Sequence, residues 1–316
     1  MRSASTCSNR LWVAVAAGLA SISIVAVCCV GLAEAFGTTV VYGPSAKELI
    51  LLTSKLAAKE GCESFCICAP GQEAFSRRLM YGTSKEGDDD KNDDSENTVP
   101  KATPISSGGD IQNALTRANT LILVCHDTPF EEKALNTLLN SAGSDLSKIV
   151  MLSKMGVSSG GGGFFGGGDS KLAQSEKTLR SVCQSKSLDL SIVRAGQLKG
   201  GGPGEPFEND FGLSKQYYNT LFELSEASCT MAHDRFTTGV DCSKGDTVDV
   251  PNALKLFGTK TSFDAAPYDT SRINAAMGTV MAAIHDKPVE FSVGTAKATT
   301  PPSREEWETI IGKMEV

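Results

Sequence analysis

Residues 148–153 read KIVMLS and residues 188–194 read LDLSIVR, and these two stretches decide the fold. Both are short runs rich in apolar residues, which is typical of strands buried inside a parallel sheet. The intervening residues 169–185 have a helical pattern, and Asp169 is a residue type that commonly caps a helix at its start. A strand, a helix and a second strand in this order predict a βαβ unit.

The same alternation extends toward the N-terminus. Runs of strand length alternate with stretches that place apolar residues at helical spacing. We expect strands at residues 38–42, 64–69 and 120–125, and helices at 47–59, 72–80, from 111 onward and at 130–141. The first two thirds of the chain are therefore expected to form a parallel sheet flanked by helices.

The pattern becomes irregular after about residue 205. We expect helices near 215–231 and 271–285, a strand at 289–293, and a last helix over 303–314 with Ser303 as its N-cap.

Three segments interrupt the pattern: the acidic residues 87–97 and the glycine-rich residues 158–168 and 200–204. We interpret the acidic segment as a solvated insert, because it lacks the spaced oxygen ligands and the closing Glu of a calcium loop. We expect the two glycine-rich segments to be mobile loops. For the first of them, a lid over the sheet edge is the alternative.

The composition is that of an ordinary globular chain. Its 316 residues are 41% hydrophobic and 21% charged, with a formal net charge of −7. An acidic balance lacks the cationic footprint that phosphate backbones require, so we expect no nucleic-acid partner. There is a single long apolar run, which excludes a polytopic membrane protein.

That run, residues 11–33, follows Arg2 and Arg10 and ends at the small-residue site of residues 33–35. This pattern predicts a signal peptide over residues 1–35, with an uncleaved membrane anchor as the alternative. The site followed by Phe36 resembles the leader of plastid precursors in diatoms and related algae. The resemblance implies the stroma of a secondary plastid, and the secretory pathway is the alternative.

Three of the ten cysteines lie in the predicted leader. The other seven are Cys62, Cys66, Cys68, Cys125, Cys183, Cys229 and Cys242. An odd number, several of them in apolar contexts, favours reduced buried thiols over a disulfide framework. Strand alternation spreads the Cys62–Cys68 group over two faces, and no second ligand pair follows, so we expect no metal site.

Several stretches together resemble one superfamily. They are Gly109-Asp110, TLILVC (120–125), KIVMLSKMGV (148–157), DSKLAQSEKTLR (169–180), LDLSIVRAGQL (188–198), TSRINAAMGTVMAAIH (270–285) and EFSVGTAKATTPPSREEWETI (290–310). They resemble the atypical short-chain dehydrogenase/reductases, in the NmrA-like and plastid NAD(P)-binding branch. The resemblance covers most of residues 38–316. It implies a Rossmann-like, doubly wound α/β domain over residues 36–316 with a small irregular C-terminal lobe.

The cofactor loop departs from this pattern. The family has G-x-x-G-x-x-G after the first strand, whereas residues 43–49 read GPSAKEL and keep only Gly43. The resemblance implies that a pyrophosphate binds the backbone groups of Ser45, Ala46 and Lys47 at the helix start. It does not decide between NAD and NADP.

Further cofactor-binding candidates follow from the resemblance. Asp110, with Ile111 beside it, matches the position near the adenine. Cys125 and His126 stand at the end of a strand, where ligands bind in open α/β sheets; we expect Cys125 to belong to the core and His126 to face the ligand side. The last candidates are Ser153, Lys171, Ala195 and Gly196.

The reductase chemistry of the family needs a Tyr four residues before a Lys, with a Ser that orients the carbonyl group. Ser153 and Lys171 occupy matching positions and are weak catalytic candidates, but residue 167 is a glycine. Hydride transfer by the usual route therefore lacks its proton donor.

Two functions remain open. The first is an NAD(P)-binding protein, either a degenerate oxidoreductase or a cofactor sensor. The second is a non-catalytic scaffold or assembly factor of the plastid that contacts protein partners. If the chain is an enzyme, we expect an NAD(P)-dependent oxidoreductase.

Overall fold

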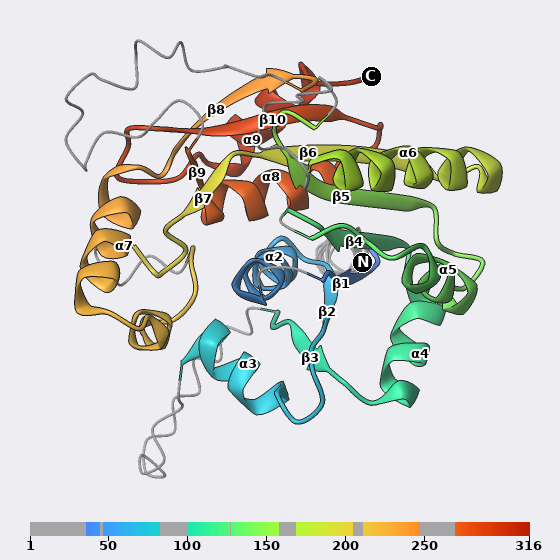
Figure 1. Cartoon of the computed structure of the whole chain (residues 1–316), viewed down its shortest axis with the longest axis horizontal. Coiled ribbons are helices and arrows are strands. Elements are labelled where there is room, and N and C mark those ends of the chain that lie inside the picture. Colours follow the sequence, from blue (N-terminus) through green and yellow to red (C-terminus); the bar gives the residue numbers. More distant parts are fainter. Residues whose placement is uncertain are drawn as a thin grey trace, which may run out of the picture.

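The computed structural model describes residues 36–44, 47–82, 100–126, 128–157, 169–204, 211–246 and 269–316. Its centre is an eight-stranded sheet in the order β3-β2-β1-β4-β5-β6-β10-β8 (Figure 1). Seven strands are parallel, and β8 pairs antiparallel with β10 at one edge. The strands are β1 (Thr38–Tyr42), β2 (Glu63–Ile67), β3 (Thr103–Ile105), β4 (Thr120–Val124), β5 (Lys148–Lys154), β6 (Asp189–Ala195), β8 (Gly239–Lys244) and β10 (Glu290–Ala296).

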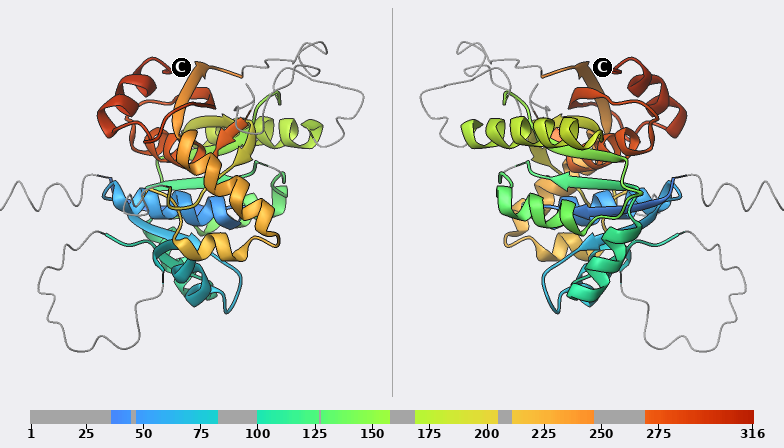
Figure 2. Two further views of the ribbon diagram at one scale, coloured as in Figure 1. Left: turned by 90° about the vertical axis from the view of Figure 1, so that its left-hand side faces the viewer. Right: turned by 90° about the vertical axis from the view of Figure 1, so that its right-hand side faces the viewer.

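Helices cover both faces of this sheet, and Figure 2 shows the layers from two sides. The helices are α2 (Lys47–Lys59), α3 (Glu73–Tyr81), α4 (Gly108–Arg117), α5 (Glu132–Ser141), α6 (Asp169–Lys186), α7 (Leu224–Phe236), α8 (Arg272–Ile284) and α9 (Arg304–Gly312). One core joins the sheet to α2, α8 and α9, and a second core joins its other face to α4, α5 and α6.

The buried strands supply both cores because neighbouring residues of a strand point to opposite faces. In β5, Val150 and Leu152 pack in the core of α2 and α8, whereas Ile149 and Met151 pack in the core of α4 to α6. A run that is apolar at every position is therefore what a strand in the middle of a doubly wound sheet requires.

The strand order confirms the predicted Rossmann-like α/β fold. The chain passes from β1 outward through β2 to β3, then returns to β4 on the other side of β1. This reversal leaves a switch point between β1 and β4 at the carboxyl edge of the sheet, where ligands bind in folds of this class.

Most predicted elements are present with ends shifted by a few residues. The helix over 47–59 and the strand over 38–42 have the expected bounds. The α8 helix has Ser271 as N-cap, and Ser303 caps α9 with a capping box to Glu306.

Four strands were not predicted. The strand β3 and the pair β7 (Gln197–Lys199) and β9 (Asp269–Ser271) have three residues each, too few for periodicity to show. The fourth is β8, whose sequence GVDCSK is largely polar, as suits a half-exposed edge strand. The C-terminal region is thus less irregular than expected, because β8 and β10 extend the main sheet.

The predicted mobile loop at 200–204 is buried in the structure. The backbone N–H groups of Gly201 and Gly202 donate to the carboxylate of Asp234 on α7, at 2.7 and 2.9 Å. Tyr218 in the 3₁₀ helix η1 (Lys215–Thr220) donates its hydroxyl to the same carboxylate at 3.0 Å. The expectation of mobility did not foresee that one buried acid would hold the loop.

Several predictions concern residues outside the described ranges. The leader of residues 1–35, the acidic insert 87–97 and the glycine-rich residues 158–168 all lie there. Within the described ranges, no helix combines the length and the apolar character that crossing a membrane requires. The seven cysteines of these ranges are all free thiols.

Candidate functional site

The carboxyl ends of β1 and β4 meet at Gly43. A Cβ atom at Gly43 would lie 2.0 Å from the carbonyl oxygen of Val124, so only glycine lets the chain leave β1 this close to β4. The helix α2 begins shortly afterward, at Lys47. A helix start beside a glycine that admits close backbone approach is the geometry in which anions bind. Ser45 and Ala46, the candidates between them, lie outside the described residues.

Lys47 stands at the start of α2, but its side chain extends toward α3. Its Nζ donates to Oε1 of Gln72 at 3.1 Å and lies 4.5 Å from the centre of the Phe75 ring. The ammonium group is thus engaged by neighbours, and the Lys47 backbone remains as the group offered to a phosphate.

Asp110 and Ile111 lie in the first turn of α4. Ser107 caps this helix: its Oγ accepts from the Asp110 backbone N–H at 3.1 Å and donates to the Asp110 carboxylate at 2.6 Å. Ile111 donates its N–H to the carbonyl oxygen of Ser107. Asp110 is exposed, so its carboxylate stabilises the helix start and stays accessible to a ligand.

Cys125 and His126 follow β4, and both are buried. Cys125 belongs to the core, as expected, and burial raises the pKa of its thiol well above the usual value. Nε2 of His126 lies 2.6 Å from the carbonyl oxygen of Gly196, which follows β6. Because β5 lies between β4 and β6, this hydrogen bond crosses the carboxyl end of β5.

Ala195 and Gly196, which follow one another at the end of β6, are also buried. Ala195 accepts from the N–H of Met155, and Gly196 donates its N–H to Oγ1 of Thr270 at 2.8 Å. Gly43, Cys125, His126, Ala195 and Gly196 thus all stand on the carboxyl edge of the sheet.

Ser153 lies on β5 with no exposed surface, and its hydroxyl is held by a residue of α6. Its Oγ donates to Oε1 of Glu176 at 2.6 Å. The same carboxylate accepts two bonds from Arg194 on β6, from Nε at 3.1 Å and from Nη2 at 2.7 Å. The Arg194 side chain is fully buried, and that of Glu176 is 6% exposed.

Two further carboxylates lie beside Arg194. Oε1 of Glu290 lies 2.8 Å from its Nη2, and Oδ2 of Asp246 lies 3.8 Å from its Nε. Burial acts to raise the pKa of Glu290, but the hydrogen bond from Arg180 and the charge of Arg194 outweigh it and lower that pKa. Ser153 therefore belongs to a buried ionic network of β5, α6, β6 and β10.

Lys171 and Ser153 have different surroundings. Lys171 lies in the first turn of α6, and its side chain is exposed to solvent, whereas the Ser153 hydroxyl faces the protein interior. The hydrogen bond that Ser153 donates goes to Glu176, another residue of α6.

Sequence reasoning missed Glu176 and Arg194 as a pair. A visible indication existed, because Arg194 ends a strand run that is otherwise largely apolar, and a charge in such a position needs a buried partner. The partner could not be named, since it lies on the preceding helix rather than on a neighbouring strand.

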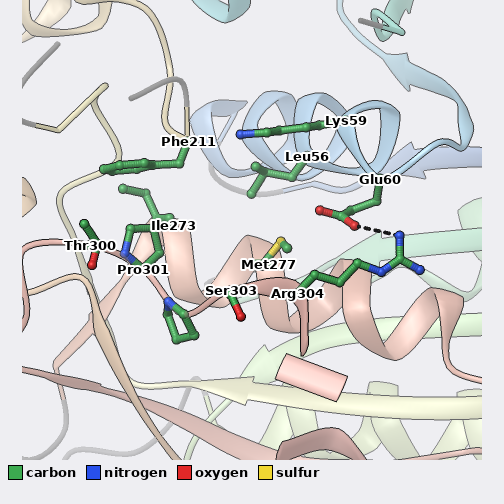
Figure 3. A pocket seen from close by; sticks show the side chains of 11 residues that line it. Leu56, Lys59, Glu60, Phe211, Ile273, Met277, Thr300, Pro301, Ser303 and Arg304 are labelled. Carbon is green, nitrogen blue, oxygen red and sulfur yellow. Dashed lines mark hydrogen bonds and ion pairs between the residues drawn. The ribbon is translucent and has the colours of Figure 1, made fainter. Parts of the chain in front are cut away.

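A separate hollow of about 360 Å³ lies between α2, α8 and the start of α9 (Figure 3). Leu56, Phe211, Ile273 and Met277 give it an apolar lining. At its edge, Nη1 of Arg304 lies 3.4 Å from the carboxylate of Glu60. Within the ranges described, no three His, Cys, Asp or Glu side chains are grouped so as to hold a metal ion.

Comparisons with known proteins give only remote similarities. No protein-family model and no curated protein matches the chain. A putative NAD-dependent epimerase/dehydratase from Bacillus halodurans is 12% identical over 88% of this chain and 100% of its own, with a TM-score of 0.47. A short-chain dehydrogenase/reductase from Veillonella parvula is 12% identical over 85% and 99%, with a TM-score of 0.43. A UDP-N-acetylglucosamine 4-epimerase from Methanobrevibacter ruminantium is 10% identical over 82% and 78%, with a TM-score of 0.44. The Rossmann-like fold itself rests on the strand order.

Proposed function

We propose that this chain binds a nicotinamide dinucleotide at the β1/β4 switch point and does not catalyse reduction by the Ser-Tyr-Lys route. The observation that carries the proposal is the approach of Gly43 to Val124, where a Cβ atom would lie 2.0 Å from the carbonyl oxygen. In dinucleotide-binding folds, the glycine that follows the first strand makes a tight turn of this kind, ahead of the helix whose start binds the pyrophosphate.

The residues of the edge fit such a ligand in part. The backbone at Gly43 and Lys47 would face the pyrophosphate, and the exposed Asp110 would lie toward the adenosine end. A bound nicotinamide would supply hydride-transfer chemistry. The hydrogen bond between His126 and Gly196 crosses the carboxyl end of β5 and holds these two residues together there.

The proton-transfer half of a reductase has no support from the geometry. Residue 167 is a glycine, the Ser153 hydroxyl donates its hydrogen bond to Glu176, and Lys171 is exposed. A group that transfers a proton must reach the reacting atom within hydrogen-bond distance. We therefore infer a cofactor sensor or a degenerate oxidoreductase.

The test is calorimetric titration of the full chain with NADPH and with NADH. Binding in the low micromolar range supports the proposal, and absence of binding at millimolar cofactor refutes it. Gly43→Ala should abolish binding because its Cβ meets Val124.

Gly143→Ala is the matched control. Its Cβ would lie 2.0 Å from the carbonyl oxygen of Thr116, so it imposes a similar steric conflict away from the carboxyl edge. If both variants melt alike and only Gly43→Ala loses the cofactor, the site is located. Equal binding losses would show that the effect is one of stability.

A scaffold function is the second candidate, and one observation favours it. Phe222 is 99% exposed and Leu224 is 86% exposed at the start of α7. Exposed apolar side chains that adjoin one another often mark a protein contact. Absence of cofactor binding, together with a stable complex that Phe222→Ser disrupts, would favour the scaffold.

A further inference from the structure

The carboxyl edge of the sheet is exposed on one side of the switch point and buried on the other. After β2 and β3, residues 69–71 and 107–110 are exposed. After β4 and β6, residues 125–126 and 195–196 are buried. In folds of this class, strands β1 to β3 and strands β4 to β6 form two halves, and a dinucleotide lies across both. The exposed side is the half that meets the adenosine, and the buried side is the half that would meet the nicotinamide.

A side chain closes the buried half. Nε2 of His126 donates to the carbonyl oxygen of Gly196 at 2.6 Å, and this hydrogen bond crosses the carboxyl end of β5. His126 is only 4% exposed, so its ring belongs to the packed interior of the edge. Protein interiors are close-packed, and a second ring cannot enter the same strand ends while the imidazole stays there.

The backbone at the end of β6 is likewise engaged within the protein. The carbonyl oxygen of Gly196 accepts from His126, and the N–H of Gly196 donates to Oγ1 of Thr270 at 2.8 Å. The carbonyl oxygen of Ala195 accepts from the N–H of Met155, which follows β5. These are groups that a ligand above the ends of β5 and β6 would contact.

The end of β5 has the same character. The Ser153 hydroxyl donates to Glu176 at 2.6 Å, and the N–H of Gly156 donates to Oδ1 of Asp246 at 2.7 Å. Both bonds link β5 and the residues after it to neighbouring elements of the protein. A nicotinamide above β5 would have to displace His126 before it could reach this part of the edge.

The exposed half keeps the groups that an adenosine diphosphate requires. The helix α2 begins at Lys47, close behind the tight passage at Gly43, and a helix start of this kind binds phosphates. Asp110 stands exposed in the first turn of α4, after β3. The two halves of the edge therefore differ in what they offer to a dinucleotide.

We propose that this chain recognises a dinucleotide by its adenosine diphosphate part, and that His126 keeps the nicotinamide ring away from the sheet edge. The inference rests on the dinucleotide site proposed above and specifies which part of the ligand that site contacts. NADH binds with its nicotinamide outside the edge, and ADP-ribose, which lacks only that ring, binds as well as NADH does. Such a site detects adenine nucleotides and does not place a hydride donor above β5.

The experiment is calorimetric titration of the full chain with NADH, with ADP-ribose and with nicotinamide mononucleotide. We expect NADH to bind no more than about fivefold more tightly than ADP-ribose, and nicotinamide mononucleotide to show no saturable binding up to about 5 mM. A larger gain for NADH, or saturable binding of nicotinamide mononucleotide, overturns this inference and leaves the proposed dinucleotide site standing. Binding of ADP-ribose without binding of NADH refutes the proposed function but supports the exclusion by His126. If neither binds, both fail.

Variants test the part played by His126. His126→Ala removes the ring and its hydrogen bond to Gly196, so the affinity for NADH relative to ADP-ribose should rise at least about fivefold. His285→Ala is the matched control. It removes a partly buried imidazole whose Nε2 lies 3.3 Å from Oε1 of Glu315, at the opposite edge of the sheet, where Lys148 at the start of β5 donates to the carbonyl oxygen of His285.

The control should leave the ratio of the two affinities unchanged. Melting curves establish that each variant is folded, and His126→Asn replaces His126→Ala should the latter fail to fold. An unchanged ratio in the folded His126 variant overturns the exclusion by this side chain. The comparison of NADH with ADP-ribose on the unaltered chain does not depend on the stability of any variant.

Discussion

Replacing Glu176 by Gln tests whether the Ser153 hydroxyl is structural. The change keeps the volume of the side chain but removes the charge that faces Arg194 at 2.7 Å. Breaking one partner of a buried ion pair costs about 3–5 kcal/mol, because the other charge is left in the interior. Glu290 still lies 2.8 Å from Arg194 and retains part of the compensation, so we expect about 3 kcal/mol.

The measurement is guanidinium-induced unfolding followed by the fluorescence of Trp307, which is fully buried in α9. Glu308→Gln is the control, because Glu308 pairs with Arg304 at 2.9 Å while 53% exposed. An exposed pair of this kind contributes about 0.3–0.5 kcal/mol. If Glu176→Gln lowers the free energy of unfolding by less than about 1 kcal/mol, the reasoning is refuted, and the Ser153 hydroxyl would again be a candidate for contact with a ligand.

The remaining predictions concern α7, its loop and the leader. Burial lowers the pKa of His233 from 6.5 to about 4, so the contribution of His233 makes the free energy of unfolding fall as the pH falls from about 6.5 to 4. Burial raises the pKa of Asp234 from 3.8 to about 6, so the contribution of Asp234 makes the free energy of unfolding fall as the pH rises from about 3.8 to 6. The two pH dependences oppose one another. His233→Asn removes the first of them, so the free energy of unfolding, measured with urea, should fall by up to about 3 kcal/mol as the pH rises from 4 to 6. An unchanged pH profile in this variant would contradict the assignment. Gly200→Ala should destabilise by at least about 2 kcal/mol, because Gly200 has φ +64° and its Cβ would lie 2.1 Å from the Asp234 carboxylate. Gly312→Ala, which meets nothing within 4 Å, should not destabilise in the same melting assay. A fluorescent protein fused to residues 1–45 should enter the plastid of a diatom host, whereas secretion would contradict the plastid prediction.

The sequence predicted the main sheet well because its strands are apolar at nearly every position. The stretches at 148–153 and 188–194 became β5 and β6 in adjacent, parallel register. Three-residue strands such as β3 and β9 escaped because a period of two cannot be read from so few residues. The edge strand β8 escaped because its burial is partial and its residues are polar.

The sequence pattern predicted that several candidate residues share the carboxyl edge of the sheet, but it did not predict their contacts. Strand ends place His126 and Gly196 on one edge, yet nothing in a strand pattern says that they bond across β5. Ser153 was chosen as a candidate from its place at a strand end, while its hydrogen-bond partner Glu176 lies on α6, the next helix along the chain. The cluster around Asp234 was not foreseen, because η1, α7 and the loop at 200–204 come together only in three dimensions.

The position of α8 in the core has a consequence for biosynthesis. Ile122, Val124, Val150 and Leu152 face the core that α8 completes, and α8 ends at Ile284. A ribosome that has finished β6 at residue 195 must still translate on the order of ten seconds, at about 5–20 residues per second, before α8 emerges. During that interval the nascent sheet offers an uncovered apolar face to chaperones. A chain that stops short of α8 would be cleared or aggregate rather than persist as a smaller folded domain.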